Sequence, residues 1–213
     1  MSAYIEDCLN MPLTEVLARM QERIMTRTTY FGITALKSPM DFWVYQEILW
    51  EEKPDVIIEI GNHHGGSTLA LAHICQLMGK GRVIGLDISH ANIPQAVRAH
   101  PQITLIEGDA CASCAQVMSL IAENETVLVI EDSSHTYENT LNVLNTYSGL
   151  IPPGGHFIVE DSICHHGLDL GPEPGPYEAI ETFIAQNDAF EIDRDRESFL
   201  MTWNPKGYLR RKQ

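Results

Sequence analysis

Short apolar runs alternate with segments in which apolar residues recur at helical spacing. The runs are rich in Val and Ile, which is typical of strands that are buried on both faces of a sheet. They predict strands at Val56–Ile60, Arg82–Asp87, Ile103–Glu107, Val127–Glu131, His156–Glu160 and Phe199–Trp203. Helices are predicted at Ser67–Met78, Ile93–His100, Ala112–Glu123, Thr136–Ser148 and Tyr177–Asn187. This alternation predicts a doubly wound α/β fold, with a mostly parallel sheet and helices on both faces.

The N-terminal part of the chain follows a different pattern, with helical spacing but no predicted strand. Residues 1–30 have one apolar face, and Asp41–Trp50 is a second helical segment that ends before Lys53-Pro54. We expect an N-terminal helical arm or cap over residues 1–50 and one compact domain over residues 51–213. Such an arm either covers the sheet or packs on a neighbouring subunit.

The net charge of the chain bears on which classes of molecule it can bind. The 213 residues include 14 Lys and Arg against 29 Asp and Glu, which gives a formal net charge of -15. Nucleic acid and anionic membranes are therefore not expected as partners, because phosphate binding requires clustered basic residues. Without an apolar run of 18 residues or a signal peptide, the sequence predicts a cytoplasmic protein. We interpret Cys111 and Cys114, an isolated C-x-x-C pair, as packing residues rather than a redox or zinc motif.

A glycine-rich turn follows the first predicted strand. Gly61-Asn62-His63-His64-Gly65-Gly66 separates this strand from a helix start, and such turns let a ligand approach the backbone. Asp87 ends the second predicted strand, 26 residues after Gly61, where an acidic residue commonly binds ribose hydroxyls. The turn departs from strict GxGxxG and is a weak signal alone.

Acidic residues end five successive predicted strands, at the edge where parallel α/β sheets bind ligands. Asp132 follows one strand, and Glu160 and Asp161 follow the next, with no basic residue nearby in sequence. Like charges this close are costly without a cation. The three carboxylates therefore predict a site for a divalent cation, with Mg²⁺ as the default.

Histidines lie at the same predicted edge. His135 follows Asp132 by three residues, where it could act as a general base or be a merely exposed loop residue. The pairs His63-His64 and His165-His166 leave a histidine-containing iron site open as a less favoured alternative.

Several motifs, in order, give the chain a family resemblance. They are Phe31-Gly32, Leu36-Lys37-Ser38-Pro39, Tyr45-Gln46-Glu47, Ile58-Glu59-Ile60-Gly61, Gly65-Gly66-Ser67, Asp132-Ser133-Ser134-His135-Thr136, Gly154-Gly155, Val159-Glu160-Asp161, Gly175-Pro176-Tyr177-Glu178-Ala179 and Asn204-Pro205-Lys206-Gly207-Tyr208-Leu209. With these motifs the chain resembles the cephalosporin-hydroxylase-like family of S-adenosylmethionine- and metal-dependent O-methyltransferases, which modify natural products such as antibiotics. The similarity covers about residues 27 to 210.

The resemblance implies a seven-stranded class I methyltransferase sheet, which is Rossmann-like, and a homo-oligomer formed through the arm. It implies cofactor contacts from Glu59, Gly61, His63, Gly65, Gly66, Ser67, Asp87, Asp109 and Ala110. Mg²⁺ would be held by Asp132, Glu160 and Asp161, and His135 would be the base. Lys37 and Tyr177 are expected near the substrate, and the loop from Ser162 to Pro176 is expected to act as a lid.

We therefore expect an S-adenosylmethionine- and Mg²⁺-dependent O-methyltransferase that acts on a hydroxyl of a small natural-product or sugar-like molecule. Three alternatives remain open at this point. One is a cofactor-binding enzyme that does not transfer methyl, such as a hydroxylase-associated protein, an isomerase or a lyase. The others are an NAD-dependent oxidoreductase and a non-catalytic partner subunit.

Overall fold

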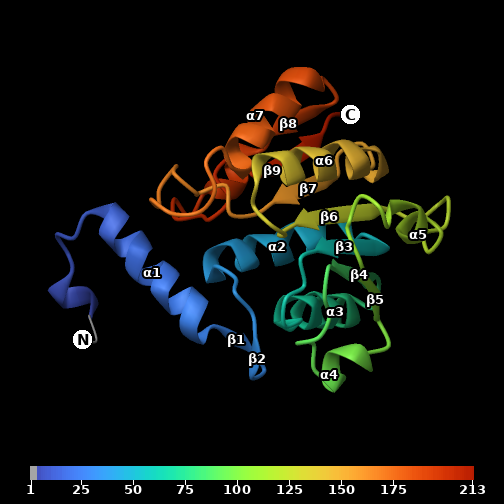
Figure 1. Cartoon of the computed structure of the whole chain (residues 1–213), viewed down its shortest axis with the longest axis horizontal. Helices are drawn as coiled ribbons and strands as arrows, with labels where there is room; N and C mark the ends of the chain where they lie inside the picture. The colour runs from blue at the N-terminus through green and yellow to red at the C-terminus, as the bar shows by residue number, and fades with distance from the viewer. Residues whose placement is uncertain (1–3) are drawn as a thin grey trace.

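Seven strands form one twisted sheet in the computed structural model, which describes residues 4–213 (Figure 1). The strand order is β5-β4-β3-β6-β7-β9-β8. The bounds are β3 Val56–Ile60, β4 Arg82–Asp87, β5 Ile103–Glu107, β6 Val127–Glu131, β7 His156–Val159, β8 Phe190–Ile192 and β9 Tyr208–Arg211. Strands β3 to β7 pair in parallel, and β9 is antiparallel to both of its neighbours. The doubly wound, mostly parallel, seven-stranded sheet is confirmed.

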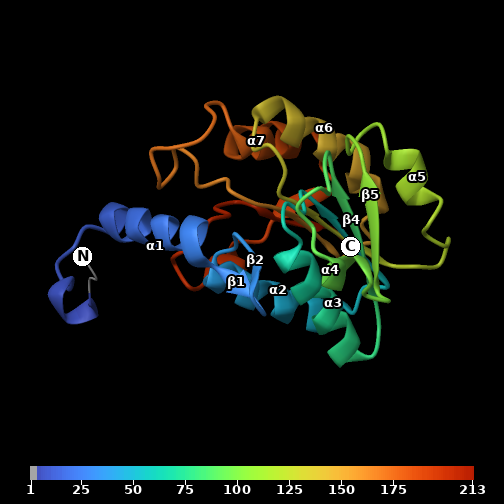
Figure 2. The same cartoon turned by 60° about the horizontal axis from the view of Figure 1, so that its bottom comes forward.

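Helices cover both faces of the sheet (Figures 1 and 2). One core cluster joins the sheet to residues of α5 Cys114–Met118, α6 Tyr137–Tyr147 and α7 Pro176–Gln186. The opposite cluster joins it to α2 Pro39–Glu52 and α3 Gly66–Met78, with α4 Gln95–Arg98 beside α3. All five residues of β3 and of β6 are buried, as their apolar composition requires for strands covered on both faces.

The N-terminal segment forms a long helix that extends from the sheet (Figure 2). After the short 3-10 helix η1 Ile5–Asp7, helix α1 spans Leu13–Arg27, and β1 Thr29–Tyr30 and β2 Ile33–Thr34 form a small hairpin. Leu17 and Ile24 of α1 pack with Ile163, Leu168 and Trp203. In the part of the chain that the structure describes, no helix has the length and apolarity needed to cross a membrane.

Two differences from the sequence predictions concern the ends of the sheet and two helices. The predicted strand Phe199–Trp203 is wrong: this segment is irregular, Phe199 and Leu200 are exposed, and Trp203 packs against α1. The last strands are instead β8 and β9, which have only three and four residues. Helices α4 and α5 are four and five residues long, shorter than predicted. The expected helical start at residues 1–3 lies outside the described residues.

Candidate functional site

A cavity of about 340 Å³ opens where β3, β4, β5 and β6 end. Most of the predicted site residues line it: Lys37, Gly61, His63, Ser67, Asp87, Asp109, Ala110, Asp132, His135 and Asp161. Glu59, Gly65, Gly66, Glu160 and Tyr177 do not. The sequence prediction that ligand-binding residues meet at the carboxyl ends of the parallel strands thus agrees with the geometry.

The turn after β3 lies against the end of β6. Gly61 has φ +94, and a Cβ there would lie 2.0 Å from the backbone oxygen of Asp132. Its N–H donates to the Leu86 carbonyl at 2.7 Å, so the ends of β3, β4 and β6 meet at this residue. Only glycine allows this approach of the backbone.

Asp87 holds the rest of the turn in place. Its Oδ2 accepts hydrogen bonds from the backbone N–H groups of Asn62 and His63, both at 2.9 Å, and its Oδ1 accepts from Ser89 at 3.1 Å. The carboxylate lines the cavity and has further acceptor capacity. It is therefore placed to accept hydrogen bonds from the hydroxyl groups of a ligand. The same carboxylate orders the loop that would cover that ligand.

Glu59 lies behind the cavity wall rather than in it. Its carboxylate is fully buried and accepts hydrogen bonds from Thr68 Oγ1 at 2.5 Å and Asn62 Nδ2 at 2.9 Å, whereas its Oε1 has no partner. Burial raises the pKa of Glu59. The arrangement places Asn62, not Glu59, against the cavity, so the predicted direct contact with a cofactor stays a prediction.

Gly65 and Gly66 pack the start of α3 rather than line the cavity. A Cβ at Gly66 would lie 2.3 Å from the Thr34 carbonyl oxygen, and one at Gly65 would lie 3.1 Å from Val97. These glycines allow α3 to approach the hairpin strand β2 and α4 closely.

A cluster of ligand-type side chains forms the other wall of the cavity. His135 Nε2 lies 3.3 Å from Asp161 Oδ2 and 3.9 Å from Asp132 Oδ1, and one ligand atom from each residue lies within 4.8 Å of the others. Among residues 4–213, this is the one such cluster of at least three side chains. His135 and Asp161 both have left-handed backbones, with φ 55 and φ 56, a strain that is concentrated at functional sites.

Lys37 corrects the premise that the three acids lack a basic partner. It is buried, and its ammonium donates to Asp132 Oδ2 and, at 2.5 Å, to Glu160 Oε1. Burial lowers the pKa of Lys37, but the carboxylates of Asp132 and Glu160 raise it by more, so the residue stays charged. The sequence could not show this contact, because Lys37 precedes Asp132 by 95 residues.

Burial raises the pKa of the other carboxyl groups at this wall of the cavity. It raises the pKa of Asp161 to about 6, against the opposing effect of His135, and the pKa of Glu131 to about 7. The pKa of Glu160 is raised well above its usual value by burial and by Asp132. The charged forms of these carboxyl groups are therefore disfavoured by burial, and a bound cation would stabilise them.

Tyr177 and the pair His165-His166 lie outside the cavity lining. Tyr177 is the second residue of α7, and its ring stacks on His166 at 3.5 Å between centroids. The Lys206 ammonium lies 4.4 Å from the centroid of the same Tyr177 ring. His166 also bonds Glu178 at 2.6 Å, and His165 bonds the Gly171 carbonyl at 3.2 Å. Among the described residues, the metal-type cluster contains neither of these histidines, nor His63 or His64.

Several cavity residues were not predicted. Thr34, Ala35, Leu36 and Met25 form a largely apolar part of the lining. The others are Ile60, Asn62, Leu86, Ile88, Gly108, Ser133, Ser134 and Asn139. The lining residues that precede β3 were the hardest to predict from the sequence, because they are uncharged and do not follow a predicted strand. Ser133, Ser134 and Asn139 follow β6 directly, and that proximity could have indicated them.

Comparisons with known proteins bear on this geometry. The sequence profile of the rhamnosyl O-methyltransferase/CmcI family matches residues 22–212. The chain belongs to this family. The rhamnosyl O-methyltransferase of Mycobacterium tuberculosis (strain ATCC 25618 / H37Rv) is 36% identical over 194 residues, covering 87% of this chain and 79% of its own length. The enzyme of the same name from Mycobacterium leprae (strain TN) is 35% identical over 197 residues, covering 89% and 85%.

Solved structures agree with the family membership. CmcI in a form with Mg and S-adenosylmethionine has a TM-score of 0.69 and 26% identity, covering 87% of this chain and 77% of CmcI. An O-methyltransferase from Bacillus cereus with S-adenosylhomocysteine, at 20% identity, has a TM-score of 0.57, covers 88% and 86%, and shares the fold. The predicted class I methyltransferase fold and the enzyme class, an S-adenosylmethionine-dependent O-methyltransferase, are confirmed. This class decides against the NAD-dependent oxidoreductase.

Proposed function

We propose that this O-methyltransferase transfers the methyl group of S-adenosylmethionine to a hydroxyl of a small, sugar-like natural product, with Mg²⁺ bound and His135 as general base. The observation that carries this proposal is the single cavity that has Asp87 and Asp109 on one wall and the cluster of Asp132, His135 and Asp161 on the other. The relatives named rhamnosyl O-methyltransferase support a sugar hydroxyl as acceptor.

The wall at the ends of β4 and β5 suits the nucleoside of the cofactor. Asp87 would accept hydrogen bonds from the ribose hydroxyls, and Asp109 and Ala110 would lie beside the adenine. Gly61, His63 and Ser67 line the space between this wall and the metal-type cluster, where the methionine part would extend. CmcI carries S-adenosylmethionine in its solved form, which agrees with the predicted cofactor.

The metal-type cluster fits Mg²⁺ by its chemistry. Asp132 and Asp161 offer carboxylate oxygens, the ligands that Mg²⁺ prefers. Glu160 lies outside this cluster but shares the Lys37 ammonium with Asp132. These three acids would hold the ion, as predicted, and CmcI is solved with Mg. When bound, Mg²⁺ would supply Lewis-acid activation and orientation of the substrate hydroxyl.

His135 is placed to remove the proton of that hydroxyl. His135 lines the cavity beside the carboxylates, and the Asp161 oxygen 3.3 Å from its Nε2 would stabilise the imidazolium that forms. Methyl transfer is an in-line displacement, so the same residues must also fix the hydroxyl opposite the sulfonium. A substrate with two neighbouring oxygens, such as a vicinal diol, would use this arrangement best.

The predicted substrate contacts differ in their support. Lys37 lines the cavity and could donate to a substrate oxygen as well as to the carboxylates. Tyr177 lies outside the lining, stacked on His166 of the loop from Ser162 to Pro176, so it would act through that loop. We retain the loop as a lid that closes over the acceptor and excludes water.

Oligomerisation through the arm is also part of the proposal. The arm carries a largely apolar groove of about 670 Å³, and Tyr4, Ile5 and Leu9 on it are exposed. A neighbouring subunit would cover this groove, because exposed apolar surface favours association. Light scattering of the full chain, compared with Leu9→Asp and Ile5→Asp, tests this: the variants should have the smaller mass.

Labelled methyl transfer tests the function directly. We expect label from S-adenosylmethionine to enter aryl or alkyl rhamnosides, with Mg²⁺ required and a chelator abolishing the transfer. Deoxy acceptors, each lacking one hydroxyl, would identify the position methylated. A protein that binds the cofactor but labels no rhamnoside would contradict a sugar hydroxyl as the acceptor.

A further inference from the structure

Asp161 presents its carboxylate from an unfavourable backbone conformation. With φ 56 it lies in the left-handed region, which costs a non-glycine residue of order 1 kcal/mol or more unless surrounding contacts enforce it. This turn directs the carboxylate toward His135, at 3.3 Å, and away from the continuation of β7. Some other part of the chain must therefore hold the turn in place.

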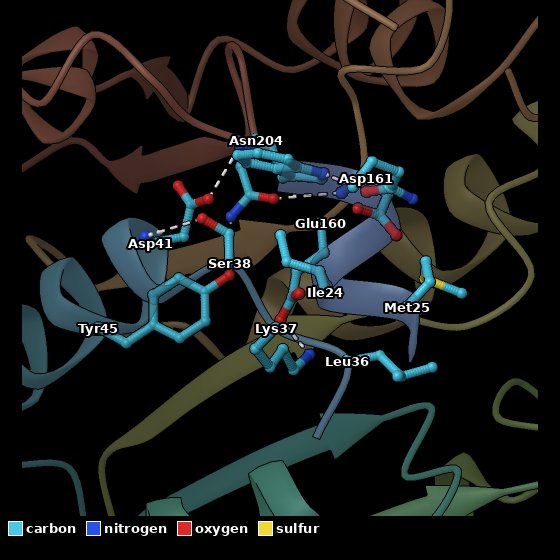
Figure 3. A pocket seen from close by; sticks show the side chains of 12 residues that line it. Ile24, Met25, Leu36, Lys37, Ser38, Asp41, Tyr45, Glu160, Asp161 and Asn204 are labelled. Atoms are coloured by element: carbon cyan, nitrogen blue, oxygen red, sulfur yellow. Dashed lines mark hydrogen bonds and ion pairs between the residues drawn. The ribbon is translucent and has the colours of Figure 1, made fainter. Parts of the chain in front are cut away.

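Asn204 provides that contact. Its Oδ1 accepts the Asp161 N–H at 3.1 Å, and its Nδ2 donates to the Tyr45 hydroxyl at 2.7 Å (Figure 3). The residue is 1% exposed, so water cannot replace either bond. A buried amide whose two ends are both used has a fixed orientation.

Tyr45 ties this amide to the rigid part of the fold. It lies on α2, is 1% exposed and belongs to the core cluster between α2, α3 and the sheet. Its ring meets that of Tyr208 edge-on, at 6.3 Å between centroids. The position of the Asp161 turn is thus set from α2, a helix that contributes no side chain of its own to the cavity lining.

The Asn204 side chain is not needed to close its own turn. The turn that contains it is closed by backbone atoms, with the Gly207 N–H donating to the Asn204 carbonyl at 2.8 Å. The neighbouring segment is attached separately, because the Ser162 hydroxyl donates to the Pro205 carbonyl and the Ile163 N–H to the Trp203 carbonyl. The amide therefore connects the Asp161 turn to Tyr45 of α2.

We propose that Asn204, held by Tyr45, is a positioning residue that aims the Asp161 carboxylate at the cation and at His135. This inference rests on the proposed function, in which Asp161 helps to hold Mg²⁺. Residues that orient a metal ligand typically contribute 10- to 100-fold to metal affinity or activity, as a rough guide. The cofactor wall at Asp87 and Asp109 is separate from this contact, so cofactor binding should not depend on it.

Calorimetric titration with Mn²⁺, a spectroscopically useful stand-in for Mg²⁺, tests the proposal on the cofactor-free protein. Asn204→Ala should weaken Mn²⁺ binding roughly 10- to 100-fold and lower kcat by a similar factor. The affinity for S-adenosylmethionine should change by less than about twofold, because no cofactor contact is lost. Tyr45→Phe, which keeps the aromatic packing, should also weaken Mn²⁺ binding, but by a smaller factor than Asn204→Ala.

Two further variants separate positioning from general stability. Asn204→Asp keeps the volume and the acceptor for the Asp161 N–H, and the Tyr45 hydroxyl can donate to its second oxygen, so it should recover part of the Mn²⁺ affinity that Asn204→Ala loses. Thr126→Val removes a 2.8 Å hydrogen bond to Asp55. These two residues directly precede β6 and β3, at the end of the strands away from the cavity, so Mn²⁺ affinity should stay unchanged.

Unchanged Mn²⁺ affinity in Asn204→Ala would overturn the inference, as would an equal loss in Thr126→Val or a parallel loss of cofactor binding in Asn204→Ala. Wild-type protein that binds neither Mn²⁺ nor Mg²⁺ would instead overturn the proposed function, and the inference with it. The two failures are therefore distinguishable.

Discussion

Three non-glycine residues that line the cavity have left-handed backbones: His63, His135 and Asp161, with φ 47, 55 and 56. Each such conformation costs free energy, and the cost is tolerated where surrounding contacts hold a side chain in a functional direction. At His63 the holding contact is Asp87, which accepts its N–H, and at Asp161 it is Asn204. The local strain thus coincides with the two walls of the site.

The general base is the most direct residue to test. His135→Ala should lower kcat by roughly 10²- to 10⁴-fold, the usual contribution of a positioned acid or base. Cofactor affinity, measured by calorimetry, should stay near that of wild type. His100→Ala, at a histidine that lies outside the cavity lining, serves as the control. A fall in cofactor affinity as large as the fall in kcat would contradict the role of a base.

Lys37 should stabilise the unliganded protein. Lys37→Met leaves the Asp132 and Glu160 carboxylates without their buried cation, and breaking such a pair typically costs about 3–5 kcal/mol. The melting temperature should fall, and saturating Mg²⁺ should restore more of it than it adds to wild type. Lys80→Met, whose pair with Asp55 is partly exposed, should change the melting temperature little. Equal Mg²⁺ effects in Lys37→Met and wild type would contradict this account.

At the scale of elements, the turn after β3 connects the cofactor wall to the metal-type cluster. Gly61→Ala would place its Cβ 2.0 Å from the Asp132 backbone oxygen, at φ +94. We expect a loss of about 3 kcal/mol or more in the free energy of unfolding, with weakened cofactor binding. Gly149→Ala meets nothing within 4 Å and should change stability by less than about 0.5 kcal/mol. Similar unfolding free energies for the two variants would refute this reading of the turn.

The elements also show what the sequence could predict. Strands β3 to β7 were predicted within one residue. Most of them are buried on both faces and therefore have continuous apolar runs, whereas β5 is partly exposed. Strands β8 and β9 were missed because they have three and four residues and pair antiparallel at the sheet edge. The apolar run Phe199-Leu200-Met201 imitates a strand, but Leu200 has φ 67, which a strand does not allow.

At the scale of the whole molecule, the sequence located the two walls of the site but not their supports. Strand ends follow from periodicity, so Asp87, Asp109, Asp132 and Asp161 could be predicted to converge. The contacts of Lys37 with Asp132 and of Asn204 with Asp161 join residues 95 and 43 positions apart. No local pattern encodes such contacts, because they arise only when α2 and the last loop fold against the sheet.

The free energy of unfolding at low pH tests one contact between residues that are far apart in the sequence. Arg82 at the start of β4 holds Glu125 before β6, with Nη2 to Oε2 at 2.9 Å, and this contact lowers the pKa of Glu125 from 4.5 to about 2. A lowered pKa contributes stability that is present above about pH 4.5 and is lost as the pH falls toward 2. Glu125→Gln should therefore be less stable than wild type at pH 6, and the difference should shrink in this window. Glu123→Gln, with the same change in charge, should show no such convergence.

The central claim is that one cavity binds S-adenosylmethionine at one wall and Mg²⁺ at the other. Calorimetric titration with the cofactor, without and with Mg²⁺, on wild type and Asp132→Ala tests it most directly. We predict cofactor binding to both proteins, and Mg²⁺ binding with methyl transfer in wild type alone. A wild-type protein that does not bind the cofactor, or an Asp132→Ala protein that retains Mg²⁺-dependent transfer, would contradict it.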